Sequence, residues 1–282
     1  MVIRVRYHAC GGGLMFRKSN IDSYVNSEAA AKLYNIYVSQ AEFENSNIEI
    51  QTPHRTFAPS SMRCARYQWF RLRGTMPDVS YHGDVVYDFF SKVGDMSHEL
   101  VQKRLHNSCG KFGNYYGNVE FLDVEDYVVD NLNPDWKYTC SKSENGYETR
   151  FELEEPYPIR FSCDGICRID GEDYLIEIKS LDYRQWCDKF EIMSKHRLQA
   201  YTYCAFLKLS KIIFIYVDRT YGNIKCFESK VSDEVVSNVY KYMDDILECT
   251  KTNIAPDGVS KDDGMCRTCM YHKTCMGYGR YE

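Results

Sequence analysis

The stretch that decides the fold is Phe161-Ser-Cys-Asp164-Gly-Ile-Cys-Arg-Ile-Asp170-Gly171-Glu-Asp-Tyr-Leu-Ile-Glu177-Ile-Lys179-Ser180. Two runs rich in strand-forming residues flank an Asp-Gly pair, which is a frequent two-residue hairpin turn. The pattern therefore predicts a β-hairpin in which Ile169 pairs with Glu172. Continuing this register places Asp164 opposite Glu177.

The second strand of this hairpin separates polar from apolar side chains. Alternation puts Glu177 and Lys179 on one face, and Ile176 and Ile178 on the other, where they can pack against a helix. Two carboxylates directly opposite each other destabilise a sheet unless a positive charge lies between them. A hard divalent cation such as Mg²⁺ or Mn²⁺ would resolve the repulsion and suit phosphodiester hydrolysis. The alternative interpretation is a surface hairpin with solvated charges.

Outward from the hairpin, helical and strand periodicities alternate, which predicts an α/β fold. We expect a central mixed sheet built on the hairpin and flanked by helices, with a helical N-terminal region and a cysteine-rich C-terminal region. Helices are expected at 27–40, from a cap at Ser60 and Ser61 through Phe70, and at 82–92, 95–105, 184–209 and 233–250. Strands are expected at 119–122, 147–153, 158–169, 173–180, 211–218 and 223–229.

Two further segments flank the hairpin. Gly94-Asp-Met-Ser-His98-Glu-Leu-Val-Gln102 precedes it, and Gln199-Ala-Tyr-Thr-Tyr203 follows it. Together with Asp164-Gly165 and Glu177-Ile178-Lys179, they resemble the RecB-like branch of the PD-(D/E)xK nucleases, over roughly residues 60–275. The resemblance implies a restriction-endonuclease-like core.

The same resemblance implies the roles of the site residues. It makes His98, Asp164, Glu177 and the backbone carbonyl of Ile178 ligands of Mg²⁺ or Mn²⁺, and Lys179 the catalytic lysine. Gln199 and Tyr203, four residues apart on one helix face, would reach the DNA backbone or the active-site carboxylates and not the core. The alternative for these two is a polar stripe on an amphipathic helix.

Thirteen cysteines include one run with metal-ligand spacing, Cys266-Arg-Thr-Cys269-Met-Tyr-His-Lys-Thr-Cys275. Cys64 resembles the distant first cysteine of the family's iron–sulfur members, which include CRISPR-associated exonucleases and the AddB nuclease domain. Four thiolates can hold either a [4Fe–4S] cluster or Zn²⁺, and the family pattern favours the cluster. The expected organisation is an N-terminal extension of unassigned role at 1–60 and a RecB-like nuclease domain at 61–282, closed by the cluster.

Composition limits the class of protein. The 282 residues carry a net charge of −5, which argues against coating nucleic acid by bulk electrostatics. The sequence shows neither a long apolar run nor a secretory signal, so we expect no membrane association and a cytoplasmic location in a bacterial, archaeal or virus-infected cell.

These features lead to one expected function and two alternatives. The expected function is a metal-dependent DNA exonuclease that acts on single-stranded DNA or free ends. The resemblance implies a helicase, recombination or CRISPR-adaptation partner. The alternatives are a structure-selective or sequence-specific endonuclease, and a module that binds DNA ends without cleaving them.

Overall fold

The computed structural model describes residues 27–46, 53, 55–78, 85–143, 146–260, 263–267 and 269–278. The chain divides into two compact units, one formed by 1–51 with 79–92 and the other by 52–78 with 93–282. In the first unit the structure describes α1 (Glu28–Ser46) and the start of α3 (Val85–Phe112). Helix α1 confirms the helix expected at 27–40. No described helix combines the length and the apolarity that a membrane span requires.

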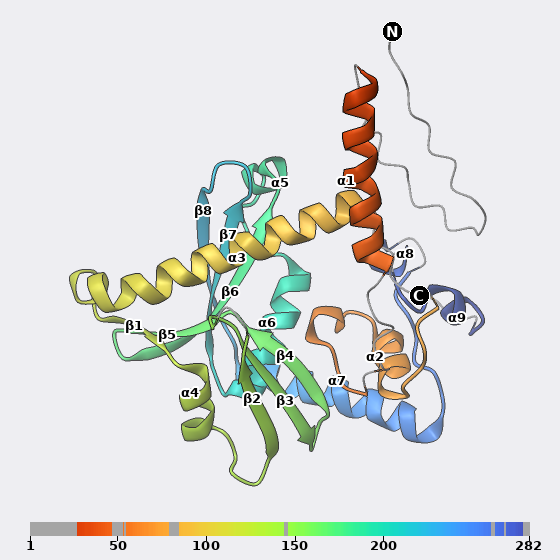
Figure 1. The fold of residues 1–282 in the computed structure, drawn as a ribbon. Coiled ribbons are helices and arrows are strands. Elements are labelled where there is room, and N and C mark those ends of the chain that lie inside the picture. The colour runs from red at the N-terminus through yellow and green to blue at the C-terminus, as the bar shows by residue number, and fades with distance from the viewer. Residues whose placement is uncertain are drawn as a thin grey trace. The chain divides into compact units, whose positions relative to one another are not determined.

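The second unit is built on a five-stranded mixed sheet in the order β1-β5-β6-β7-β8 (Figure 1). Its strands are β1 (Val119–Leu122), β5 (Gly165–Ile169), β6 (Glu172–Leu181), β7 (Lys211–Asp218) and β8 (Ile224–Lys230). Strands β6 and β7 are parallel and the other neighbours antiparallel. The predicted hairpin register is confirmed from Ile169↔Glu172 to Gly165↔Ile176.

A second, three-stranded sheet corrects the expected strand at 158–169. It contains β2 (Lys137–Lys142), β3 (Thr149–Glu155) and β4 (Ile159–Cys163), so β4 and β5 belong to different sheets. The chain changes sheets at Asp164. A Cβ at Gly165 would lie 2.3 Å from Cζ of Phe121, so only glycine allows this close approach. Asp164 therefore lies one residue outside the β5–β6 ladder and is not a ladder partner of Glu177.

Two helix predictions also need correction. The expected helices at 82–92 and 95–105 are the single helix α3, described from Val85 onward, because a glycine such as Gly94 is tolerated within a long helix. The expected helix at 184–209 is instead α5 (Tyr183–Cys187) and α6 (Ser194–Leu207). Between them, Lys225 Nζ donates to the backbone carbonyls of Trp186, Cys187 and Lys189, which satisfies carbonyls that a continuous helix would have used.

The helix expected from a serine cap begins later and has a different cap. Ser61 ends the short helix η1 (Pro59–Ser61), and α2 (Ala65–Leu72) follows. Cys64 is the N-cap of α2, with its Sγ accepting from the backbone N–H of Tyr67 at 3.4 Å. The remaining elements are η2 (Gly113–Tyr115), α4 (Val124–Asn131), α7 (Asp233–Thr252), α8 (Gly264–Arg267) and α9 (His272–Met276).

Apolar side chains pack against both faces of the central sheet. Ile176 and Ile178 pack with Val101 and Leu105 of α3 in the smaller core, as alternation predicts. The larger core contains residues of α2, α6 and α7 and the oppositely facing side chains of the strands, such as Leu175. Glu177 and Lys179 alternate with Ile176 and Ile178, so β6 presents these two charged residues on the face of the larger core.

Candidate metal-binding active site

Asp164, at the point where the chain changes sheets, is held by two elements. Its carboxylate Oδ2 accepts a hydrogen bond of 2.6 Å from the backbone N–H of Ile178 in β6. Its backbone carbonyl accepts one of 3.1 Å from Nε2 of Gln102 in α3. Both Asp164 and Gln102 are buried. These bonds fix the carboxylate relative to β6 and α3.

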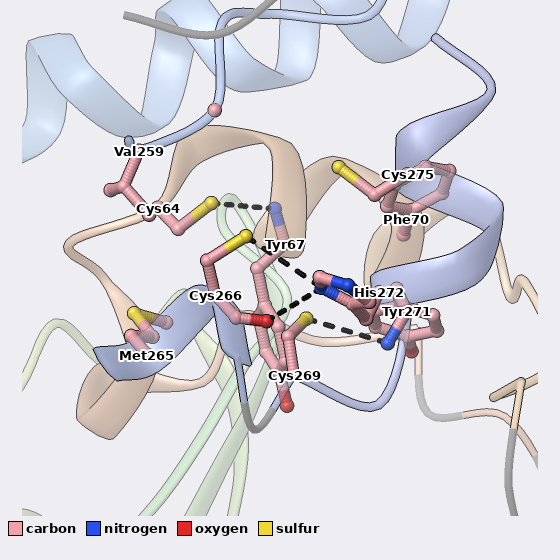
Figure 2. A pocket seen from close by; sticks show the side chains of 11 residues that line it. Cys64, Tyr67, Phe70, Val259, Met265, Cys266, Cys269, Tyr271, His272 and Cys275 are labelled. Carbon is pink, nitrogen blue, oxygen red and sulfur yellow. Dashed lines mark hydrogen bonds between the residues drawn. The ribbon is translucent and has the colours of Figure 1, made fainter. Parts of the chain in front are cut away.

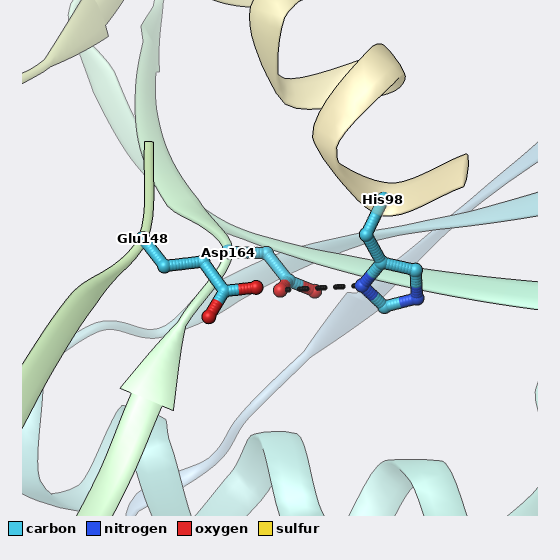
Figure 3. Close-up of side chains that lie close together, drawn as sticks. All are labelled: His98, Glu148 and Asp164. Atoms are coloured by element: carbon cyan, nitrogen blue, oxygen red, sulfur yellow. Dashed lines mark ion pairs between the residues drawn. The ribbon is translucent and has the colours of Figure 1, made fainter. Parts of the chain in front are cut away.

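His98 and Glu148 converge on this carboxylate from two other directions (Figure 3). His98 on α3 has its Nδ1 3.6 Å from Oδ1 of Asp164. Glu148 directly precedes β3, and one ligand atom from each of the three residues lies within 4.8 Å of the other two. An imidazole and two carboxylates are a suitable ligand set for a divalent cation. Glu148 belongs to no recognised motif, so only the fold identifies it.

Glu177 and Lys179 form an ion pair beside this group. Glu177 is 1% exposed, and Lys179 Nζ lies 2.5 Å from its Oε1. That distance satisfies an ion pair, although Oε1 lacks a hydrogen-bond donor in good geometry. Glu177 is not part of the 4.8 Å group. The structure therefore brings His98 and Asp164 together as expected, adds Glu148, and pairs Glu177 with the lysine.

The site is electrostatically coupled. Burial raises the pKa of Glu177 to about 7, Lys179 opposes this, and the charge of Asp164 adds to it. Burial also opposes ionisation of Asp164, but His98, Lys179 and the Ile178 N–H outweigh it, so the pKa of Asp164 is lowered. Burial disfavours the imidazolium of His98, yet Asp164 more than compensates, and the pKa of His98 is raised. A cation at the site would favour ionised carboxylates and a neutral imidazole.

Gln199 and Tyr203 on α6 contact each other, with Gln199 Nε2 donating to the Tyr203 hydroxyl at 2.6 Å. The expectation that both avoid the core is wrong for Tyr203, which is 4% exposed and stacks on Phe161 with ring centroids 4.6 Å apart. An aromatic ring at this position contributes more by packing than it would as part of a polar stripe. Burial, then the charge of Glu177, raises the pKa of Tyr203, so its hydroxyl stays protonated beside the carboxylates.

The four predicted cysteine ligands line a single pocket (Figure 2). Cys64 comes from the start of α2, Cys266 from α8, Cys269 from the connection to α9, and Cys275 from α9. The other lining residues are Tyr67, Phe70, Gly258, Val259, Met265, Tyr271 and His272.

The thiols of this pocket fit a metal centre. Burial, followed by the charges of the other cysteines, raises the pKa of Cys269 to about 12, and burial with the charges of Cys275 and Cys64 raises that of Cys266. Ionised thiols that line one pocket need a cation to balance their charge. The four sulfurs do not form a described group within 4.8 Å.

Comparison with known proteins gives no family assignment. No family model matches the chain, and no curated protein matches it. The chain is similar to the solved structure of SSO0001, with 16% identity, 86% of this chain and 96% of that chain covered, and a TM-score of 0.43. It is also similar to an alkaline exonuclease (LHK-Exo) from Laribacter hongkongensis, with 13% identity, 46% and 64% coverage, and a TM-score of 0.33. LHK-Exo in complex with dAMP gives 14% identity, the same coverage and a TM-score of 0.32.

Proposed function

We propose that this chain is a metal-dependent DNA exonuclease that hydrolyses phosphodiester bonds from single-stranded ends. The observation that carries the proposal is the convergence of His98, Glu148 and Asp164, from three separate elements, beside the buried Glu177–Lys179 pair. Charged side chains of the same sign and of opposite sign are rarely clustered at one site without a functional reason.

The side chains have distinct proposed roles. His98, Asp164, Glu177 and the Ile178 carbonyl would hold Mg²⁺ or Mn²⁺, with Glu148 as a further ligand. When bound, such an ion lowers the pKa of a water molecule and stabilises charge on the phosphate. Lys179 would hold the attacking water or a phosphate oxygen. Gln199 would fix the Tyr203 hydroxyl toward the carboxylates. The hydrogen bond between the two residues supports this role, as does the effect of the Glu177 and Asp164 charges on the pKa of Tyr203.

We further propose a structural [4Fe–4S] cluster at Cys64, Cys266, Cys269 and Cys275, with Zn²⁺ as the alternative occupant. Support comes from the shared pocket and from the metal-ligand spacing of Cys266, Cys269 and Cys275 in the sequence. Such a centre would close the proposed nuclease domain at 61–282. The resemblance adds a helicase, recombination or CRISPR-adaptation partner and a cytoplasmic setting.

Digestion of labelled DNA tests the nuclease proposal. Linear and circular single-stranded DNA are incubated with the full chain and Mg²⁺ or Mn²⁺, with Asp164→Asn as the inactive control. We expect loss of the linear substrate only. Cleavage of circles would favour an endonuclease, and metal-independent binding without cleavage of either substrate would favour a DNA-end-binding module.

Metal analysis tests the cluster. Protein prepared without air should contain iron and sulfide and absorb broadly in the visible range, and Cys64→Ala should lose both the colour and solubility. Stoichiometric zinc without iron would reject the iron–sulfur assignment and retain the thiolate centre.

A further inference from the structure

Arg66 is among the largest fully buried side chains, with an exposure of 1%. It lies in the first turn of α2, two residues after Cys64. Removing a guanidinium from water is costly unless anions and hydrogen-bond acceptors surround it, and arginine keeps its charge at all physiological pH values. The partners of Arg66 therefore indicate what its charge is for.

Those partners lie on both sides of the guanidinium. Nε donates to the Pro256 carbonyl at 2.7 Å, and Nη1 lies 3.8 Å from Sγ of Cys275. Nη2 is 4.0 Å from a carboxylate oxygen of Asp257, whose side chain is 56% exposed and hence screened by water. Cys275 is one of the residues that line the thiol pocket. The arginine thus joins α2, the 256–257 segment and α9 at the edge of that pocket.

Charge balance explains such an arrangement. Four thiolates carry a total charge of about −4. Zn²⁺ or an oxidised [4Fe–4S] core supplies a charge of only about +2, so the centre keeps a net negative charge. A buried cation beside one sulfur offsets this charge where the dielectric constant is low. Charge-assisted donation to a metal-bound sulfur also orients the ligand.

We propose that Arg66 is the cationic partner of the metal centre, donating to Sγ of Cys275 and retaining the bound metal. The inference rests on the proposed thiolate centre. Arg66 acts through Cys275 and is a positioning residue. A residue of purely structural importance would stabilise the chain equally with and without metal, whereas Arg66 should matter mainly when metal is bound.

The test follows metal release from the full chain. Wild type, Arg66→Met, Arg66→Lys and Cys275→Ser are prepared without air and incubated with EDTA, while bound iron and zinc are measured. Arg71→Met is the matched control, because Arg71 lies on the same helix and donates to the Thr56 carbonyl at 2.7 Å. Thermal unfolding of the metal-free proteins supplies the second readout.

We expect Arg66→Met to release metal at least about tenfold faster than wild type, with Arg66→Lys close to wild type and Arg71→Met unchanged. Metal-free Arg66→Met should lose about as much stability as metal-free Arg71→Met, because each substitution removes one hydrogen bond to a backbone carbonyl. If the methionine variant does not fold, Arg66→Gln provides the same comparison.

If Arg66→Met releases metal at the wild-type rate, the proposed role of Arg66 is wrong. The same follows if the substitution destabilises the metal-free and the metal-loaded protein equally. Cys275→Ser separates this failure from that of the centre itself. If Cys275→Ser retains all its metal, the thiolate centre is wrong. If it loses metal while Arg66→Met behaves as wild type, only the inference about Arg66 fails.

Discussion

Glu148 is the single residue whose assignment depends most on the fold. If it ligates the cation with His98 and Asp164, Glu148→Gln should weaken Mn²⁺ binding by about tenfold or more, because an amide cannot replace the charge of a carboxylate. Titration calorimetry measures this. Glu154→Gln is the matched control, since Glu154 is an exposed residue of β3, the strand that Glu148 directly precedes. Equal affinities for wild type and Glu148→Gln would remove Glu148 from the site.

Tyr203 combines a packing role with a polar one, and two substitutions separate them. Tyr203→Phe keeps the ring on Phe161 and removes only the hydroxyl, so the free energy of unfolding should fall by about 1 kcal/mol while cleavage slows markedly. Tyr203→Ala should cost about 3–5 kcal/mol through the cavity it leaves. Denaturant unfolding and single-turnover cleavage distinguish the two. Full activity of Tyr203→Phe would leave the residue with its core role alone.

Among the elements, the junction of β4 and β5 places Asp164, and Gly165 makes that junction possible. Gly165→Ala should destabilise the protein by about 2 kcal/mol or more, because its φ of 155° is rare for other residues and its Cβ would collide with Phe121. Phe121→Ala should relieve part of this loss in a double-mutant cycle. Denaturant unfolding gives the four free energies. Strict additivity of the two substitutions would mean that the collision contributes nothing.

The elements also show what local sequence can predict. The hairpin register follows from the turn and from alternation, which are local properties, so the face shared by Glu177 and Lys179 was predictable. The sheet change at Asp164 depends on Phe121 from β1, and the break between α5 and α6 depends on Lys225 from β8. Such long-range contacts override local periodicity and cannot be read from it.

The same distinction applies to the candidate site. Glu177 and Lys179 lie within one hairpin and Asp164 directly precedes it, so the pattern of this segment indicates all three directly. His98 needed the family resemblance, because nothing in a lone helical histidine indicates its partner. Glu148 lies 16 positions before Asp164 and is brought beside it by the β3–β4 ladder, in which the neighbouring Thr149 pairs with Cys163. The alternation within each strand does not reveal this register, because the register depends on how the two strands pair.

In the molecule as a whole, the thiol pocket joins α2 to a tail about two hundred residues later in the chain. The tail has other anchors, since the Asp78 carboxylate accepts from Thr274 N–H at 2.9 Å and Asp78 N–H donates to the Met270 carbonyl at 2.8 Å. A metal clip over so long a loop restricts the unfolded chain and stabilises the closed form.

We therefore expect metal removal to open the tail before the sheet. After treatment with EDTA, amide hydrogen exchange should accelerate in 263–278 while β6 stays protected, because the sheet has its own core. After EDTA treatment, Asp164→Asn should show the same faster exchange in the tail as wild type. This result excludes an effect of the metal site around Asp164. Simultaneous loss of protection in the tail and in β6 would contradict a separate role for the pocket.

The central claim is that the hairpin carries a catalytic site, and Lys179→Ala tests it most directly. A lysine that only balanced the charge of a surface carboxylate would contribute at most about 1 kcal/mol. A lysine that stabilises charge in the transition state should affect the rate, by about 100-fold or more.

The decisive measurement is single-turnover cleavage of end-labelled single-stranded DNA with Mn²⁺, by wild type and Lys179→Ala. Parallel titrations measure the affinity of each protein for Mn²⁺ and for DNA. We predict a rate loss of about 100-fold or more with both affinities largely retained. A wild-type cleavage rate in Lys179→Ala would contradict the active-site assignment and, with it, the role given to the hairpin.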